Sequence, residues 1–174
     1  ARSGAVAGLC PTTEANLGDG LFDLPRWRSH GGAWGVGSDS HVCVNAAEEL
    51  LMLEYSQRLA TRQRNVCATP AQPSVATAMT LAAVAGGAQA SGRPVAGLQA
   101  GQSADFVVLD PNHTALAGLD AADQLSAHVF ASHRSNAVAQ VITAGQERVA
   151  QGRHPLHDEA AAAFVAARSQ LLTP

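Results

Sequence analysis

The sequence contains no lysine, and its eleven arginines are scattered along the chain rather than clustered. A protein that neutralises a phosphate backbone needs a basic surface, whereas the formal net charge here is −3. We therefore expect no nucleic-acid partner. No apolar run is as long as a membrane span, and the first ten residues lack the charged start and apolar body of a signal peptide. We therefore also expect no membrane partner.

Cysteine and aromatic residues are scarce. The three cysteines, Cys10, Cys43 and Cys67, are far apart, and no two have the spacing of a metal knuckle or a redox pair. This usage favours a reducing cytoplasm. Hydrophobic residues make up 47% of the chain and aromatic residues only 4%, so we expect a core of Ala, Val and Leu. A length of 174 residues suffices for one average domain or two small ones.

The first part of the chain contains two successive strand, loop and helix patterns. An apolar run at 4–9 stops at Cys10 and Pro11, and residues 12–20 follow as a polar, glycine-rich loop. A short helix at 24–31 then precedes a second strand at 33–37. This alternation predicts an α/β fold with a parallel sheet.

Helix signals and then strand signals dominate the rest. Asn45 can cap a helix with an apolar face, and Ser74 can cap a second, to about Ala90, that is apolar on nearly every face and predicted to be largely buried. From Ser91 onward the sequence is rich in turn-forming residues and then in β-branched residues, which indicates a domain boundary. The later predicted elements are a strand at 106–109, a helix at 120–132, a hairpin of 138–143 and 147–150 turning at 144–146, and a final helix capped by Asp158 that ends near Leu172.

Asp39 and His41 share the loop that follows the second predicted strand, where parallel α/β proteins gather their ligands. Zinc accepts carboxylate and imidazole ligands, but a catalytic site needs about three protein ligands. The chain has no His-x-His or His-Glu-x-x-His, so it holds only a fraction of a metal site. The plain alternative is that Ser38, Asp39 and Ser40 only turn the chain. We interpret His113, His128 and His133 as structural.

Four stretches carry a resemblance to a known family. They are residues 10–20 (CPTTEANLGDG), 37–41 (GSDSH), 48–59 (EELLMLEYSQRL) and the spaced pattern of Gly97, Leu98, Gly101, Ala104, Asp105, Val107 and Val108. Together they resemble the amidohydrolase superfamily and, within it, the C-terminal part of the formimidoylglutamate deiminases. The resemblance covers nearly the whole chain.

The resemblance implies the C-terminal portion of a (β/α)8 metal-dependent hydrolase barrel and part of a small β-sandwich. Residues 1–90 would hold the last βα units, with strands 7 and 8 and the helices that follow them. Residues 91–155 would belong to the sandwich, and residues 156–174 would form the C-terminal helix. A full barrel needs roughly 250 residues, so most of the barrel would lie upstream.

The resemblance also implies a hydrolase of C–N bonds. Zinc, or another divalent metal, would be held by upstream histidines and by Asp39, which would also accept a proton. Ser38, Glu14 and Asn16 would bind the substrate. The implied reaction converts N-formimino-L-glutamate and water to N-formyl-L-glutamate and ammonia, in histidine degradation.

Three further expectations follow from an incomplete barrel. The isolated chain should be inactive, it should need the upstream barrel segment, and it should otherwise form a homo-oligomer such as a dimer, because strand edges and apolar faces would be exposed. Two alternative functions remain open. One is a deaminase of the same superfamily that acts on a purine-like or pyrimidine-like ring. The other is a non-catalytic assembly domain in which Asp39 only turns the chain.

Overall fold

The structure, a computed structural model, describes residues 1–95, 97–132 and 134–172. His133 therefore lies outside the described residues. The chain divides into two compact units. The first comprises Ala1–Gln102 and Pro111–Asn136, and the second comprises Ser103–Asp110 and the chain from Ala137 onward. This division does not follow the boundary expected at residue 91, because helix α5 (Ala121–Phe130) packs against helices of the first unit.

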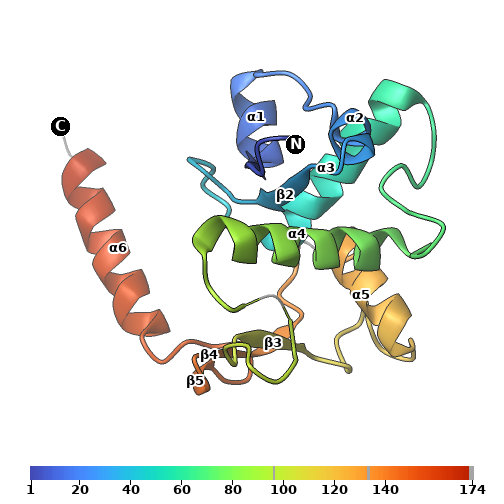
Figure 1. The fold of residues 1–174 in the computed structure, drawn as a ribbon. Helices are drawn as coiled ribbons and strands as arrows, with labels where there is room; N and C mark the ends of the chain where they lie inside the picture. Colours follow the sequence, from blue (N-terminus) through green and yellow to red (C-terminus); the bar gives the residue numbers. More distant parts are fainter. Residues whose placement is uncertain (96, 133, 173–174) are drawn as a thin grey trace. The chain divides into compact units, whose positions relative to one another are not determined.

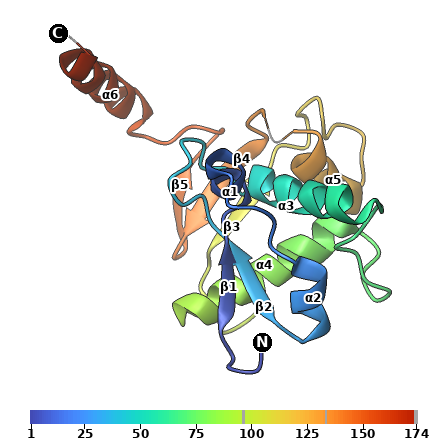
Figure 2. The same ribbon diagram turned by 90° about the horizontal axis from the view of Figure 1, so that it is seen from above.

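Two parallel strands stand at the centre of the first unit (Figure 2). β1 (Val6–Leu9) pairs with β2 (Ala33–Val36), with Val6 opposite Ala33 and Leu9 opposite Val36. Both strands were predicted, and so was their parallel pairing. Because they run in the same direction, the segments that follow Leu9 and Val36 emerge at the same end of the pair.

The segment after β1 corrects one expectation. The predicted loop at 12–20 is largely a helix, α1 (Pro11–Leu17), which ends at Gly18 in the left-handed conformation with φ of 76°. Pro11 stops the strand but also suits the first position of a helix, where its missing N–H costs nothing. Glu14 accepts the Cys10 backbone N–H at 2.8 Å and so stabilises the start of α1.

Each of the other helices of this unit begins at a polar cap, as predicted for Asn45 and Ser74. α2 (Leu24–Ser29) is capped by Asp23, α3 (Ala46–Thr61) by Asn45, α4 (Val75–Ser91) by Ser74 and α5 by Asp120. In each case the cap side chain accepts backbone N–H groups of the first turn. Of these helices, α4 packs against both strands and α3 against β2, whereas α5 packs on α3 and α4 (Figure 1).

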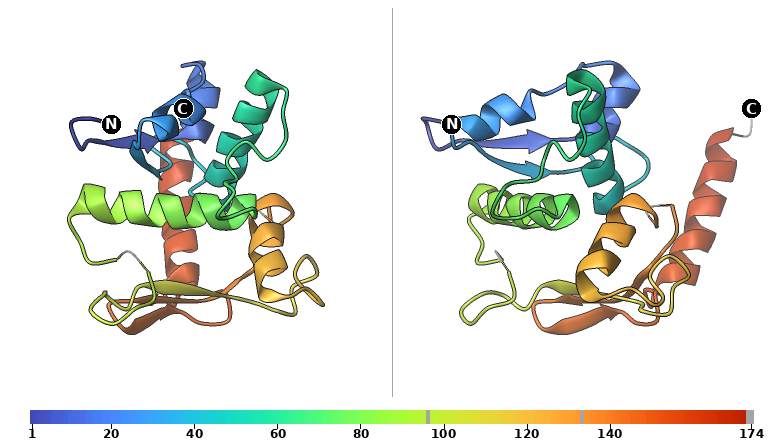
Figure 3. Two further views of the ribbon diagram at one scale, coloured as in Figure 1. Left: turned by 45° about the vertical axis from the view of Figure 1, so that its right-hand side comes forward. Right: turned by 90° about the vertical axis from the view of Figure 1, so that its right-hand side faces the viewer.

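α4 packs against both strands (Figure 3). A Cβ at Gly86 would stand only 1.9 Å from the Trp34 carbonyl oxygen, so glycine permits the close approach of helix and strand. The expectation that α4 is largely buried is correct for this face only. Leu81 and Val84, on other faces of the helix, are exposed.

The core contains Leu24, Leu53 and Met79 and a buried carboxylate, Glu54, whose hydrogen bonds are satisfied. Glu54 is 0% exposed; it accepts the Arg58 Nε–H at 2.7 Å and the backbone N–H of Cys67 at 2.9 Å. The Arg58 guanidinium in turn lies over the Tyr55 ring, 5.3 Å from its centroid. These contacts attach the loop after α3 to the helix.

The second unit contains an antiparallel sheet with the order β3, β4, β5. β3 (Phe106–Leu109) pairs with β4 (Val138–Thr143), which turns into β5 (Gln146–Val149), as the sequence predicts. Ala144 and Gly145 form the turn with φ of 50° and 75°. α6 (His157–Leu172) begins one residue before the expected cap, so Asp158 lies within its first turn, and none of its described residues is buried.

Among the described residues, no helix combines the length and the hydropathy that crossing a membrane requires.

Candidate functional site

Asp39 lies directly beyond the carboxyl end of β2. It is exposed, and its φ of 47° falls in the left-handed region, which Asp tolerates better than most residues. Within the described ranges, no hydrogen bond or ion pair engages its carboxylate. The side chain is therefore available to bind a cation or to exchange a proton.

The loop that carries Asp39 is fastened to the segment after β1. The Ser38 carbonyl oxygen accepts the Thr13 hydroxyl at 2.7 Å and the His41 backbone N–H at 2.9 Å. One residue earlier, the Gly37 N–H donates to the Leu9 carbonyl at 2.9 Å. The strand pairing thus continues one residue beyond β2, and the Thr13 hydroxyl holds the Asp39 loop against α1.

A buried carboxylate fixes the start of α1 from a third element. Glu49, in α3, is 1% exposed, and its Oε2 accepts the Thr12 backbone N–H at 3.0 Å while its Oε1 accepts the Thr12 hydroxyl. Sequence reasoning missed Thr12, Thr13 and Glu49. A signal was present, because Glu49 has i+4 spacing to Leu53, which predicts the inward face of the helix.

Glu14 and Asn16, predicted to bind the substrate, both lie on α1. The Glu14 carboxylate accepts the Cys10 N–H, so one of its oxygens already serves the helix start. Asn16 is exposed on the same helix. Ser38, the third predicted substrate residue, is half-buried beside Asp39. The structure therefore brings Ser38, Asp39 and the first turn of α1 together, and no hydrogen bond joins Glu14 or Asn16 to Asp39 among the described residues.

Negative charge gathers around Cys10 at this end of the strands. Burial raises the pKa of the Cys10 thiol, and the charges of Asp39, Glu49 and Glu14 raise it further. The three carboxylates come from three different segments, namely the β2 loop, α3 and α1. Their common effect on one thiol indicates a locally anionic environment, which suits a cation.

The remaining histidines do not complete a metal site. The Cys43 N–H donates to His41 Nδ1 at 3.2 Å, so this nitrogen serves its own loop. Burial lowers the pKa of His128, and His113 lowers it further. Over residues 1–95, 97–132 and 134–172, no three His, Cys, Asp or Glu side chains are placed to hold a metal ion. The described residues therefore do not form a complete metal centre by themselves.

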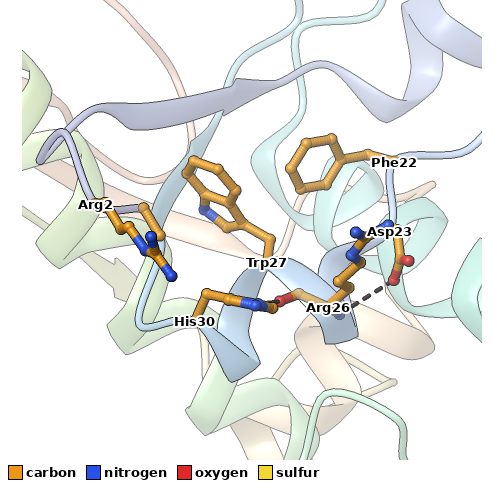
Figure 4. A pocket seen from close by; sticks show the side chains of 7 residues that line it. Arg2, Phe22, Asp23, Arg26, Trp27 and His30 are labelled. Carbon is orange, nitrogen blue, oxygen red and sulfur yellow. Dashed lines mark hydrogen bonds between the residues drawn. The ribbon is translucent and has the colours of Figure 1, made fainter.

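A separate pocket lies at the opposite end of the two strands (Figure 4). Its volume is about 390 Å³, and Arg2, Arg26, Trp27 and His30 are among its lining residues. Arg2 precedes β1 and His30 precedes β2, so the pocket belongs to the amino ends of the strands. It contains none of the predicted site residues, and we do not assign the site there.

Comparisons with known proteins place the chain in one family. The model of the Amidohydrolase family matches residues 1–148. Formimidoylglutamate deiminase from Pseudomonas aeruginosa is 46% identical over 172 residues, which cover 99% of this chain and 38% of the relative. The chain thus spans well under half the length of that relative.

Two solved structures share the fold. An amidohydrolase from Brucella melitensis superposes with a TM-score of 0.90 at 46% identity, over 99% of this chain and 38% of that chain. An adenosine deaminase from Xanthomonas campestris with bound zinc superposes with a TM-score of 0.77 at 20% identity, over 94% of this chain and 36% of that chain. At 20% identity, the second likeness shows the fold alone.

Proposed function

Because the chain belongs to the amidohydrolase family, we propose that it is the C-terminal portion of a formimidoylglutamate deiminase. The observation that carries this proposal is the 46% identity to the Pseudomonas aeruginosa enzyme, which extends over 99% of this chain. The reaction would be hydrolysis of N-formimino-L-glutamate to N-formyl-L-glutamate and ammonia, a step of histidine degradation. The upstream part of the protein would complete the barrel and the site.

Asp39 is the residue of this chain that we assign to the metal. Three observations support the assignment: Asp39 is exposed and no partner engages its carboxylate within residues 1–95, 97–132 and 134–172, it follows the carboxyl end of β2, and the environment around Cys10 is anionic. Zinc or another divalent metal, when bound, supplies the Lewis acidity that makes water a nucleophile near neutral pH. Upstream ligands would provide the remaining positions, because a catalytic site needs about three protein ligands.

Asp39 would also move the proton. A carboxylate that contacts the attacking water can accept its proton and deliver it to the departing nitrogen, so that ammonia leaves as a neutral molecule. The atoms balance, since water contributes the oxygen of the formyl group and both hydrogens that the nitrogen gains. Ser38 would orient the substrate beside Asp39, and Glu14 and Asn16 would contact it from α1.

A ring deaminase is the second candidate. The observation that favours it is a relative from Bacillus cereus, a 5-methylthioadenosine/S-adenosylhomocysteine deaminase, which is 28% identical over 91% of this chain and 35% of the relative. Steady-state assays of the full-length protein with N-formimino-L-glutamate and with adenosine separate the two. Turnover of the first compound alone is expected, and turnover of adenosine alone would overturn the proposed substrate.

Asp39→Asn in the full-length protein tests the assignment of Asp39 to the metal. Loss of a metal ligand and proton acceptor should lower ammonia release by more than about 100-fold and reduce the zinc content measured by elemental analysis. Asp19→Asn is the matched control, because Asp19 is an exposed acid that follows α1. Full zinc content and full activity in Asp39→Asn would contradict the assignment.

A further inference from the structure

The orientation of Asp39 depends on a contact that the sequence does not reveal. The carbonyl oxygen of Ser38 belongs to the planar peptide that leads into Asp39, and it accepts two hydrogen bonds, from the Thr13 hydroxyl at 2.7 Å and from the His41 N–H at 2.9 Å. Two donors on one oxygen fix the plane of that peptide. The backbone of Asp39 therefore starts from a defined direction.

The conformation of Asp39 makes such a restraint useful. Its φ of 47° lies in the left-handed region, where a non-glycine residue persists only if its surroundings hold it. The His41 N–H comes from the same loop and moves with it. The Thr13 hydroxyl comes from another element, so it is the bond that ties the Asp39 turn to the rest of the unit.

Thr13 is itself held in place through its neighbour. Both oxygens of Glu49 accept hydrogen bonds from Thr12, one from the backbone N–H and one from the hydroxyl. Thr12, Thr13 and Glu49 are all buried. A buried carboxylate is stable only when its hydrogen bonds are satisfied, so Glu49 holds the first turn of α1 in one position against α3. The Thr13 hydroxyl is thereby aimed at Ser38.

We propose that Thr13 is a positioning residue for Asp39, acting through the Ser38 carbonyl, and that Glu49 anchors Thr13 through α1. The inference rests on the proposed role of Asp39 as a metal ligand. It predicts that the geometry of that ligand is set by a hydroxyl on α1, the helix that follows β1, as well as by the Asp39 loop. Neither Thr13 nor Glu49 needs to contact the metal or the substrate.

The test is the zinc affinity of the full-length protein, measured by chelator competition. Thr13→Val keeps the shape of the side chain but removes the hydroxyl, and it should weaken zinc binding about 10-fold to 100-fold, as loss of a supporting hydrogen bond around a metal site commonly does. Thr13→Ser restores the donor and should bind zinc within about threefold of the unmodified protein. Glu49→Gln should weaken binding in the same direction.

A matched control comes from α4. The Thr80 hydroxyl is buried and has no hydrogen-bond partner among the described residues, so Thr80→Val removes a buried hydroxyl without removing a bond. Its zinc affinity should be unchanged. Removal of a buried hydrogen bond also lowers stability, so thermal unfolding of the metal-free proteins is used to choose a temperature at which every variant is folded, and weaker zinc binding by a folded variant then reports on positioning.

The possible outcomes separate this inference from the proposed function. Unchanged zinc affinity in Thr13→Val, with lost affinity in Asp39→Asn, overturns the positioning role alone. Retained zinc in Asp39→Asn overturns the metal role of Asp39. Should Thr13→Val fail to fold, the zinc affinities of Glu49→Gln and Thr13→Ser provide the test. A zinc affinity in Glu49→Gln equal to that of the unmodified protein overturns the proposal that Glu49 anchors Thr13.

Discussion

At the scale of single residues, the raised pKa of Cys10 reflects its burial and the negative charge of the candidate site. Its thiol is half-buried where β1 ends, and the carboxylates of Asp39, Glu49 and Glu14 all act on it. A thiolate is disfavoured there because burial removes its hydration and three like charges oppose it. The same three charges favour a cation, so the reactivity of one cysteine can serve as a probe of the environment that we assign to the metal.

Alkylation should therefore follow a defined order. Cys43 is exposed, whereas burial raises the pKa of both Cys10 and Cys67. At pH 7.5, iodoacetamide should label Cys43 first, Cys10 about 10-fold or more slowly, and Cys67 only after unfolding, as read by peptide mass spectrometry. Asp39→Asn should accelerate labelling of Cys10 and leave Cys43 unchanged. Equal labelling rates for Cys10 and Cys43 would refute this description of the site.

At the scale of elements, the packing of α4 on β2 depends on one small residue. Gly86 brings the helix so close to the Trp34 carbonyl that no Cβ fits, while Gly87, the next residue, would place its Cβ in open space. The close approach holds β2 against the helix, and β2 leads into Asp39. Of these two adjacent positions in one helix, position 86 therefore has no room for a side chain, whereas position 87 has.

The two glycines make a matched pair of variants. Gly86→Ala should destabilise the protein by about 2–3 kcal/mol, because the new methyl group forces helix and strand apart. Gly87→Ala should be neutral or stabilise by roughly 0.5–1 kcal/mol, since alanine restricts the unfolded chain and favours the helix. Urea unfolding followed by circular dichroism measures both. Comparable destabilisation by the two substitutions would contradict the packing described here.

The sequence predicted the elements better than it predicted their contacts. Polar caps at Asn45 and Ser74 mark helix starts because capping is local, and local signals survive in any context. α1 was missed because Pro11 fits both a strand end and a helix start. The hydrogen bonds of Thr12 and Thr13 join residues 37 and 25 positions apart, and no local pattern encodes such pairs.

The candidate site shows the same limit. Asp39 was identified by its place after a predicted strand, which is a local observation, but its assignment to a metal came from the family resemblance. The exposed faces of α4 show a further limit. The apolar pattern of this helix predicts that Leu81 and Val84 are buried, but it does not identify the segment that covers them. We propose that the upstream barrel segment covers them.

At the scale of the whole molecule, the strand pair is too small to be complete. In the first unit, β1 and β2 pair only with each other among the described strands, so the outer edge of each is unpaired. A barrel strand has two neighbours, and open edges invite association with other chains. The chain also spans 38% of the length of the Pseudomonas aeruginosa relative. Both facts support the need for an upstream segment.

The isolated 174-residue chain should therefore release no ammonia from N-formimino-L-glutamate, even with zinc added. It should also self-associate, which light scattering after size exclusion detects. Supplying the upstream segment as a separate polypeptide should restore a defined particle and activity, and a chain carrying Asp39→Asn should restore the particle alone. Robust turnover by the isolated chain, or a cooperative monomer, would refute the proposal that this is an incomplete barrel.

The open edges of β1 and β2 have a consequence for synthesis in the cell. A ribosome makes a protein from its amino end, so in the proposed full-length enzyme these two strands would emerge after the rest of the barrel and would be the ones that close it. Asp39 would be the last of the implied metal ligands to leave the ribosome. Nascent or prematurely terminated chains would then lack the means to retain zinc, and metal loading would mark a polypeptide whose translation has passed this point.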